Sequence, residues 1–126
     1  MAKFNIADAK SRFSELVQKA MVGEEVIIAK AGKPNIKMQF DFYHVQIVGG
    51  DLLYRLEKFM PVIGHLQCAA VPSRHEPDEG EINYRAVFEA VDQLGYRGWI
   101  GAEYRPRSRT EDGLGWAQPY GVVPVK

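Results

Sequence analysis

The sequence predicts an α/β fold of hybrid α+β type, in which two segments share one mixed sheet. Residues 1–34 follow the pattern strand, helix, strand, strand. Residues 35–126 alternate β-branched runs with amphipathic stretches in the order strand, helix, strand, helix, strand, which indicates a parallel βαβαβ unit. The chain has 126 residues, enough for one domain, so we expect the two segments to fold together.

The first segment contains a predicted amphipathic helix over residues 6–22. Asn5 can cap its N-terminus, apolar residues then recur every three or four positions, and Gly23 ends it. The β-branched run 25–30 predicts a strand, and the turn residues AGKP predict a hairpin that returns through residues 35–38.

The join between the segments carries no turn signal. Residues 35–47 therefore indicate one extended run, which at about 3.3 Å per residue would be more than twice as long as a usual strand. We expect a bend or bulge near Met38, or a strand that pairs with different neighbours at its two ends.

The second segment has clear helix boundaries. Asp51 caps a helix that Pro61 ends, and Asn83 caps another that Gly95 follows; the final residues predict an irregular tail. The predicted parallel strands are residues 39–47, 62–71 and 98–104.

Charge is balanced overall, with 16 basic and 16 acidic side chains, but uneven along the chain. Residues 1–37 carry seven basic and four acidic side chains, a net charge of +3, and the remainder carries −3. A basic segment is compatible with nucleic-acid contact, and a solvated charged face is the alternative.

The single cysteine, Cys68, excludes an internal disulfide, and its apolar neighbours predict a buried, inert thiol. No apolar run reaches the ~18 residues of a membrane span, and charged residues near the N-terminus interrupt any signal peptide. We therefore expect a cytoplasmic protein without a membrane partner.

The run FNIADAKSRFSELVQKAMVGEEVIIAKAGKP resembles the N-terminal half of a prevent-host-death (Phd) type antitoxin. This resemblance implies a homodimer and nominates Lys10, Arg12 and Lys33 for DNA contact. The toxin-binding segment of that family has no counterpart here, so we expect no toxin partner. A foreign segment fused near residue 35 would disturb the two-fold spacing that operator binding needs, so DNA binding should be weak or lost.

Three oxygen-bearing side chains, Asp41, Gln67 and Glu103, lie on or near the three predicted parallel strands. Their neighbours are apolar, and an unpaired polar group there costs free energy. A hard divalent cation would explain this placement. Backbone or solvent partners are the commoner explanation of such residues, and spacing alone leaves both open.

The runs QFDFYHVQIVGGDL, IGHLQCAAVPSRHEPDEGEINY and GYRGWIGAEYRP resemble the C-terminal part of a hydroxypyruvate isomerase, a metal-dependent TIM barrel. The resemblance implies that Asp41, Gln67 and Glu103 are ligands of Mg²⁺ or Mn²⁺, and that His44 contacts substrate. Glu103 also matches one of two glutamates that move a proton between neighbouring carbons through an enediolate. No residue in 1–38 matches the motif of the second glutamate, so we expect weak metal binding and no measurable turnover.

Several other residues have more than one interpretation. His75 and Glu76 match a loop at the mouth of the family's active site, and a solvated loop is the alternative. Arginines near the C-terminus could form an anion patch, and nearby aromatic residues could stack on a ligand, but the patch has low specificity and packing is the favoured role of the aromatics. These are Arg105, Arg107 and Arg109, and Trp99, Trp116 and Tyr120.

Together these observations predict a chimera, engineered or recombinant, in which antitoxin and isomerase fragments fold together without an evolved activity. Two alternatives stay open: a residual metal-dependent hydroxypyruvate isomerase site, and a DNA-binding antitoxin-like dimer. A natural recombinant gene is also compatible with the sequence.

Overall fold

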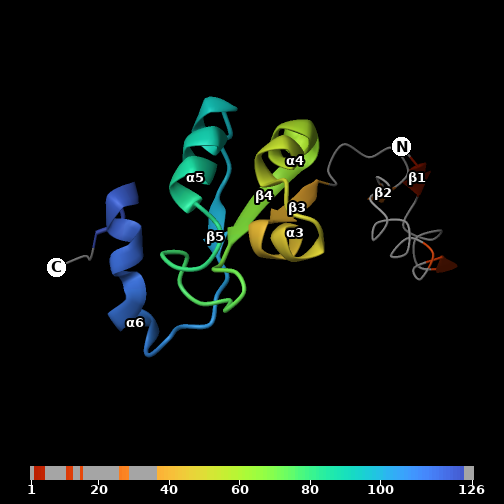
Figure 1. Ribbon diagram of the computed structural model, residues 1–126. Coiled ribbons are helices and arrows are strands. Elements are labelled where there is room, and N and C mark those ends of the chain that lie inside the picture. The colour runs from red at the N-terminus through yellow and green to blue at the C-terminus, as the bar shows by residue number, and fades with distance from the viewer. Residues whose placement is uncertain (1, 5–10, 13–14, 16–25, 29–36, 124–126) are drawn as a thin grey trace. The chain divides into compact units, whose positions relative to one another are not determined.

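The computed structural model describes residues 2–4, 11–12, 15, 26–28 and 37–123 (Figure 1). The chain divides into two compact units, Met1–Lys37 and Met38–Lys126. The helix predicted over residues 6–22 and the hairpin strand predicted over residues 35–38 lie largely outside the described residues.

In the first unit, two short strands pair in parallel. They are β1 (Ala2–Phe4) and β2 (Val26–Ile28), with Lys3 opposite Ile27. The strand predicted over residues 25–30 is therefore present as β2.

The second unit contains the predicted three-stranded parallel sheet, in the order β3-β4-β5. The prediction of one mixed sheet is wrong for the described strands, which form two separate parallel sheets, because no antiparallel return strand is among them. The elements of this unit are β3 (Met38–Asp41), α3 (Phe42–Val48), α4 (Leu52–Phe59), the 3₁₀ helix η1 (Met60–Val62), β4 (Ile63–Cys68), α5 (Tyr84–Gln93), β5 (Ile100–Ala102), α6 (Thr110–Gly113) and the 3₁₀ helix η2 (Leu114–Tyr120).

The strand predicted over residues 39–47 is wrong beyond Asp41, where a helix begins. Asp41 has extended backbone angles (φ −104°, ψ 111°), and its Oδ1 accepts a hydrogen bond from the Tyr43 backbone N–H at 2.9 Å. This is the bond of a helix N-cap, and α3 follows directly. The alternating aromatic residues of FDFYH imitate a strand, but the capping carboxylate starts a helix instead.

A register shift lies at the start of β3, between Met38 and Gln39, which confirms the predicted bulge. Beyond it the register with β4 is continuous, and it fixes which side chains share a face of the sheet. The pairs are Gln39 with His65, Phe40 with Leu66, and Asp41 with Gln67.

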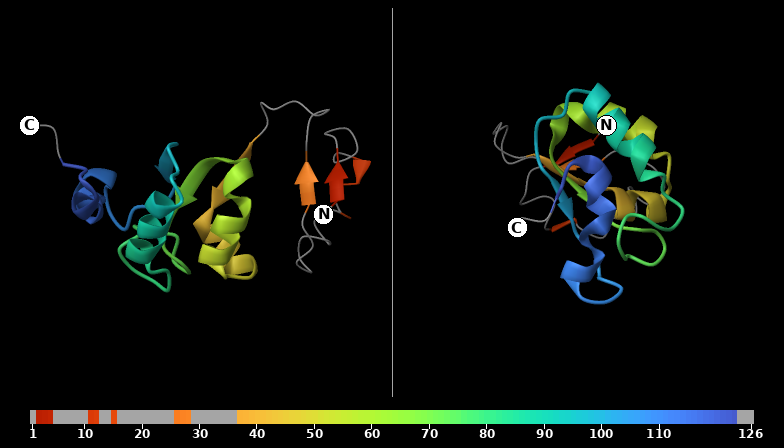
Figure 2. Two further views of the ribbon diagram at one scale, coloured as in Figure 1. Left: turned by 90° about the horizontal axis from the view of Figure 1, so that it is seen from above. Right: turned by 90° about the vertical axis from the view of Figure 1, so that its left-hand side faces the viewer.

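One face of this sheet is apolar and covered by helices. Phe40 on β3 and Leu66 on β4 are buried in one core with Leu56 of α4 and Val91 of α5. In the left view of Figure 2, the yellow-green α4 and the cyan α5 lie on the same side of β4. Burial of each such side chain stabilises the fold by about 1.5–3 kcal/mol, so apolar residues occupy this face. Polar residues of the strands lie on the opposite face.

The predicted helix boundaries are confirmed for α5, and those of the other helices agree less well with the structure. Asn83 Oδ1 accepts a hydrogen bond from the Ala86 N–H at 3.2 Å, and Gly95 follows the helix with φ +74°, both as predicted. Asp51 precedes α4 as predicted, but its side chain makes no capping hydrogen bond. The tail, predicted to be irregular, instead contains α6 and η2.

Candidate functional site

The face of the sheet opposite the core carries polar side chains from β3 and β4, and β5 contributes Gly101 to it. Register partners in a parallel sheet point to the same face, and residues two positions apart share it. Asp41 is opposite Gln67, and Gln67 is opposite Gly101, so these three positions share one face. A Cβ built at Gly101 would lie 3.0 Å from His65 Nε2 and 3.6 Å from Gln67 Cγ, which confirms that these side chains lie over the glycine.

Asp41 lies at the C-terminal end of β3 and is largely buried. One of its carboxylate oxygens caps α3, and the other, Oδ2, lies 3.8 Å from His44 Nε2. His44 stands in the first turn of α3 with an exposed ring, so the helix that Asp41 caps also brings this imidazole beside the carboxylate.

Gln67 is held by a neighbour on the same face. Its Oε1 accepts a hydrogen bond from Gln39 Nε2 at 2.6 Å, between β4 and β3. The bond fixes the amide so that its oxygen is already turned toward the β3 side of the polar face.

Glu103 directly follows β5, two residues after Gly101, and its backbone N–H donates to the Cys68 carbonyl at 3.1 Å. Its carboxylate accepts two hydrogen bonds from Arg74 Nη2, at 3.2 and 3.1 Å. Sequence reasoning missed Arg74, which lies 29 positions earlier in the chain, and no local pattern marks such a partner.

The donor set fits a hard divalent cation, because carboxylate and amide oxygens are the ligands that Mg²⁺ and Mn²⁺ prefer. Within the described part of the chain, no group of three or more His, Cys, Asp or Glu side chains gathers in a way that could hold a metal ion. The predicted set contains an amide, Gln67, and its third member, Glu103, is paired with Arg74. The assignment of these three residues as ligands stays a prediction.

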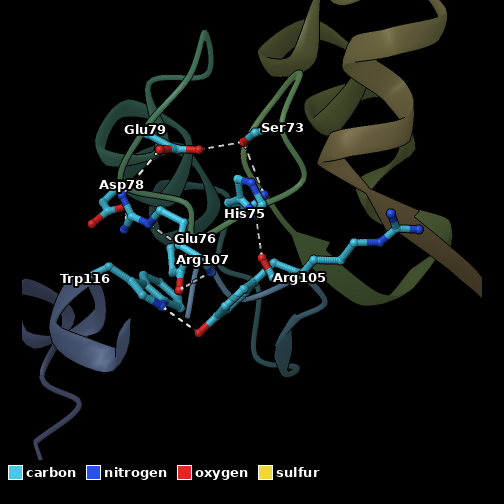
Figure 3. A network of polar contacts seen from close by, with 9 residues as sticks. Ser73, His75, Glu76, Asp78, Glu79, Arg105, Arg107 and Trp116 are labelled. Atoms are coloured by element: carbon cyan, nitrogen blue, oxygen red, sulfur yellow. Dashed lines mark hydrogen bonds and ion pairs between the residues drawn. The ribbon is translucent and has the colours of Figure 1, made fainter. Parts of the chain in front are cut away.

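A buried carboxylate, Glu76, joins the loop after β4 to the segment after β5 (Figure 3). Only 1% of its side chain is exposed, and it accepts hydrogen bonds from the Arg107 backbone N–H at 3.2 Å and from Arg107 Nε at 3.0 Å. Burial alone would raise the pKa of this carboxyl, but the backbone N–H groups of Glu76 and Arg107 and the Arg107 charge lower it below its usual range. Glu76 is therefore held as an anion.

The same Arg107 side chain reaches two further carboxylates. Its Nη2 lies 2.7 Å from Asp78 Oδ1 and its Nη1 lies 3.3 Å from Glu79 Oε2, while Ser73 donates to Glu79 at 2.6 Å. The interpretation of this region as a solvated loop is therefore wrong for Glu76, and Arg107 is not a free member of an anion patch.

His75 is fixed by a second bridge between these segments. Its Nδ1 lies 2.7 Å from the Arg105 carbonyl oxygen, which can only accept, so Nδ1 carries the proton. Trp116 donates to the Tyr104 hydroxyl at 3.2 Å beside this network, which confirms a packing role for that indole.

The other nominated residues have mixed outcomes. Lys10 and Lys33 lie outside the described residues, and Arg12 pairs with Glu15 at 2.5 Å.

Trp99 was expected to pack, but 85% of it is exposed. Tyr120 packs edge-on against Phe88, with ring centroids 4.8 Å apart. The remaining arginine of the predicted patch, Arg109, is exposed beside Glu111 and Asp112.

Cys68 is buried on the apolar face, as predicted. Burial, with a smaller contribution from the negative charge of Asp41, raises the pKa of the thiol to about 12. The described helices include none that is both long and apolar enough to cross a membrane.

A parallel sheet with helices on one face and polar residues at the C-terminal ends of its strands is the arrangement found in part of a TIM barrel. Residues 24–120 match the family described as xylose isomerase-like TIM barrel. The chain belongs to this family.

Within the family, its curated relatives are isomerases. It is 55% identical over 96 residues to a 2-oxo-tetronate isomerase of Cupriavidus necator and 57% identical over 88 residues to that of Pectobacterium atrosepticum. A putative hydroxypyruvate isomerase of Xenopus laevis is 45% identical over 95 residues. These matches cover 76%, 70% and 75% of this chain but only 37%, 34% and 34% of the relatives, so the chain spans about a third of their length.

Solved structures agree on the fold. The crystal structure of an AP endonuclease, family 2, from Brucella melitensis matches with a TM-score of 0.71 and 35% identity, over 90% of this chain and 55% of that one. A 3-keto-D-glucoside 4-epimerase from E. coli matches with a TM-score of 0.59 and 20% identity, over 88% of this chain and 52% of that one, which shows the fold alone.

These matches overturn the prediction of an engineered or recombinant chimera without an evolved activity. The relatives are proteins of named organisms and are called isomerases, and the family match begins at residue 24, inside the segment assigned to an antitoxin. The antitoxin assignment is therefore not supported, and the DNA-binding dimer loses the resemblance from which it was predicted. An amphipathic helix followed by a β-branched strand is common to many α/β proteins, so a likeness built on that pattern carried little specificity.

Proposed function

We propose that this chain carries part of an isomerase site that moves a proton between neighbouring carbons of a small hydroxylated 2-oxo acid. The supporting observation is the polar face, on which Asp41 and Gln67 are register partners and Glu103 follows their neighbour Gly101 by two residues. The substrates that the relatives' names give, 2-oxo-tetronate and hydroxypyruvate, each contain a carboxylate, a carbonyl and an adjacent hydroxyl.

Glu103 is the proposed proton carrier. About half of its side chain, 53%, is exposed, so a substrate can reach the carboxylate. Its backbone is fixed by the hydrogen bond to the Cys68 carbonyl, which keeps the side chain at the end of β5. A positioned acid or base of this kind typically contributes about 10²- to 10⁴-fold in rate.

His44 is the proposed contact to a substrate oxygen. Its imidazole is exposed on the first turn of α3, and its Nε2 lies 3.8 Å from Asp41 Oδ2. An N–H group of this exposed ring can donate a hydrogen bond to a carbonyl or hydroxyl oxygen of a substrate.

Asp41, Gln67 and Glu103 would hold a Mg²⁺ or Mn²⁺ ion. When bound, such an ion supplies positive charge that stabilises the negative charge developing on the substrate oxygens. We expect the affinity to be modest, because the Glu103 carboxylate is already paired with Arg74.

Calorimetric titration with Mn²⁺ and a coupled isomerase assay with hydroxypyruvate and 2-oxo-tetronate test this proposal. Asp41→Ala and Glu103→Ala should abolish Mn²⁺ binding, and Glu103→Gln should remove turnover. Glu89→Gln is the matched control, since Glu89 is an exposed carboxylate on α5 that pairs with Arg85 at 3.2 Å. Turnover or Mn²⁺ binding that survives the loss of Glu103 would contradict the assignment.

Self-association is a further part of this proposal. Among the described strands, β3 and β5 each have one edge without a partner strand. Open edges invite pairing with another chain, so we expect a homo-oligomer. Light scattering at high protein concentration decides this, and a monodisperse monomer would contradict it.

A further inference from the structure

Arg74 lies in the loop that follows β4 and has an unusual backbone conformation. Its φ is +60°, in the left-handed region that residues other than glycine rarely adopt. Its N–H donates to the Ala70 carbonyl at 2.8 Å, and its carbonyl accepts from the Arg105 N–H at 2.8 Å. The surrounding structure therefore holds the backbone in a strained conformation that aims this side chain.

The Arg74 side chain spans the ends of β3 and β5. Its guanidinium carbon lies 5.0 Å from the centre of the Tyr43 ring, in the first turn of α3, and its Nη2 bonds both oxygens of Glu103. The N–H groups on Nε and Nη1 have no hydrogen-bond partner within the described residues, and 28% of the side chain is exposed. The guanidinium is held by Tyr43 and Glu103, and its remaining N–H groups can donate to a second carboxylate.

We infer that Arg74 is an internal cation that competes with the metal for Glu103 and, once released, pairs with the carboxylate of the incoming 2-oxo acid. The inference rests on the proposed function, since it takes Glu103 as a metal ligand. The exposed Glu103–Arg74 pair is weak enough to exchange, because water and dissolved salt screen ion pairs at the surface. Tyr43 keeps the guanidinium in place during the exchange through its ring face.

Competition between Arg74 and the metal ion predicts the direction in which metal affinity changes when Arg74 is replaced. A positive charge next to a cation site weakens cation binding, so removal of the Arg74 charge should strengthen it. We expect Arg74→Gln to bind Mn²⁺ roughly two- to fivefold more tightly than the wild-type chain, and Arg74→Lys, which keeps the charge, to remain near wild type. A gain in affinity is informative because a merely damaged fold would lose affinity.

Loss of the Arg74 charge should have the opposite effect on the substrate carboxylate, whose binding it should weaken. In titrations of the Mn²⁺-loaded protein, hydroxypyruvate should bind Arg74→Gln about tenfold or more weakly, whereas the neutral ketone dihydroxyacetone should bind both proteins alike. Arg85→Gln is the control arginine: its side chain is 84% exposed on α5 and pairs with Glu89. That variant should match wild type in both titrations.

Four outcomes separate the possibilities. Tighter Mn²⁺ and weaker hydroxypyruvate in Arg74→Gln support the inference. Mn²⁺ binding that Asp41→Ala abolishes but Arg74→Gln leaves unchanged overturns this inference and leaves the proposed function standing. Equal losses for hydroxypyruvate and dihydroxyacetone overturn carboxylate recognition by Arg74. No Mn²⁺ binding by wild type and Arg74→Gln alike overturns the inference together with the proposed function.

Discussion

Two glutamate–arginine pairs join the loop after β4 to the segment after β5, and they differ in burial. The Glu76 side chain is 1% exposed and the Glu103 side chain 53% exposed. Arg107 bonds Glu76 through both its backbone N–H and its Nε, whereas Arg74 reaches Glu103 through a single nitrogen. The buried pair is suited to fixing the loops, and the exposed pair is suited to exchanging partners.

The difference follows from solvation. A carboxylate without water must keep its protein hydrogen bonds, because an unsatisfied buried charge costs far more than the bond itself is worth. An exposed carboxylate can give up one partner for water, a cation or a substrate at little cost. One chemical pairing therefore serves two roles, and burial separates them.

The largest effect should come from the exposed member. Glu103→Gln should lower isomerase turnover by about 10²- to 10⁴-fold, since it removes the proposed proton carrier, and should leave the free energy of unfolding within about 0.5 kcal/mol of wild type. Turnover assays and urea denaturation measure the two quantities. A large loss of stability would mean that the two pairs do not differ as burial suggests.

The buried member should behave in the opposite way. Glu76→Ala should lower the free energy of unfolding by about 1–3 kcal/mol, because it removes the acceptor of the Arg107 backbone N–H and of its Nε. Urea denaturation measures the change. Asp78→Ala is the control, since it removes an exposed partner of the same Arg107, and it should cost less than half as much.

The packing around Glu76 offers a way to break the buried pair without touching its charge. A Cβ at Gly113 would overlap Oε1 of Glu76, so Gly113→Ala must displace the carboxylate. We expect a loss of about 1–2 kcal/mol in the free energy of unfolding, by thermal or urea denaturation. Gly115→Ala is the control, because its Cβ would meet no atom within 4 Å.

Acid should weaken the buried pair. The pKa of Glu76 is lowered in the folded chain, so its contribution to stability is complete above its unfolded pKa, near 4.3, and is lost as the pH falls through the folded pKa. Stability measured between pH 6 and pH 3 should therefore fall less steeply in Glu76→Gln than in wild type. Equal slopes would show that Glu76 is not held as an anion.

The arginine of the exposed pair should also contribute little to stability. Arg74→Gln should change the free energy of unfolding by less than about 1 kcal/mol, since it loses one exposed ion pair and keeps the same backbone conformation. Denaturation in urea measures it. A loss as large as that of Glu76→Ala would make Arg74 a structural residue and remove the contrast between the pairs.

The sequence predicted the parts of the fold that depend on local signals. Asn83 and Gly95 bound α5 where a capping side chain and a left-handed glycine were expected. The bulge near Met38 is present as predicted, although the long extended run from which it was predicted ends at Asp41. Asp41 shows the limit of such reasoning. Its carboxylate could serve a strand, a metal or a helix cap, and only the three-dimensional structure reveals that it caps α3.

Contacts between distant residues were beyond the sequence. The buried acceptor Glu76 lies 31 positions from Arg107, in a polar stretch that composition alone assigns to solvent. The one signal in the sequence was the excess of acidic residues around Glu76, which predicts a positively charged partner. Several arginines could have been that partner, and the sequence does not distinguish them. The resemblance supplied the residues of the polar face, and it could not supply their partners.

The buried thiol of Cys68 can report when the core of the second unit opens. Its pKa is raised to about 12 by burial, and only 1% of the residue is exposed, so the folded chain presents almost no reactive thiolate. Because it is the only cysteine in the chain and lies in the core, we expect alkylation to report states in which that core has opened. The rate of thiol labelling therefore measures opening of the core without an added probe.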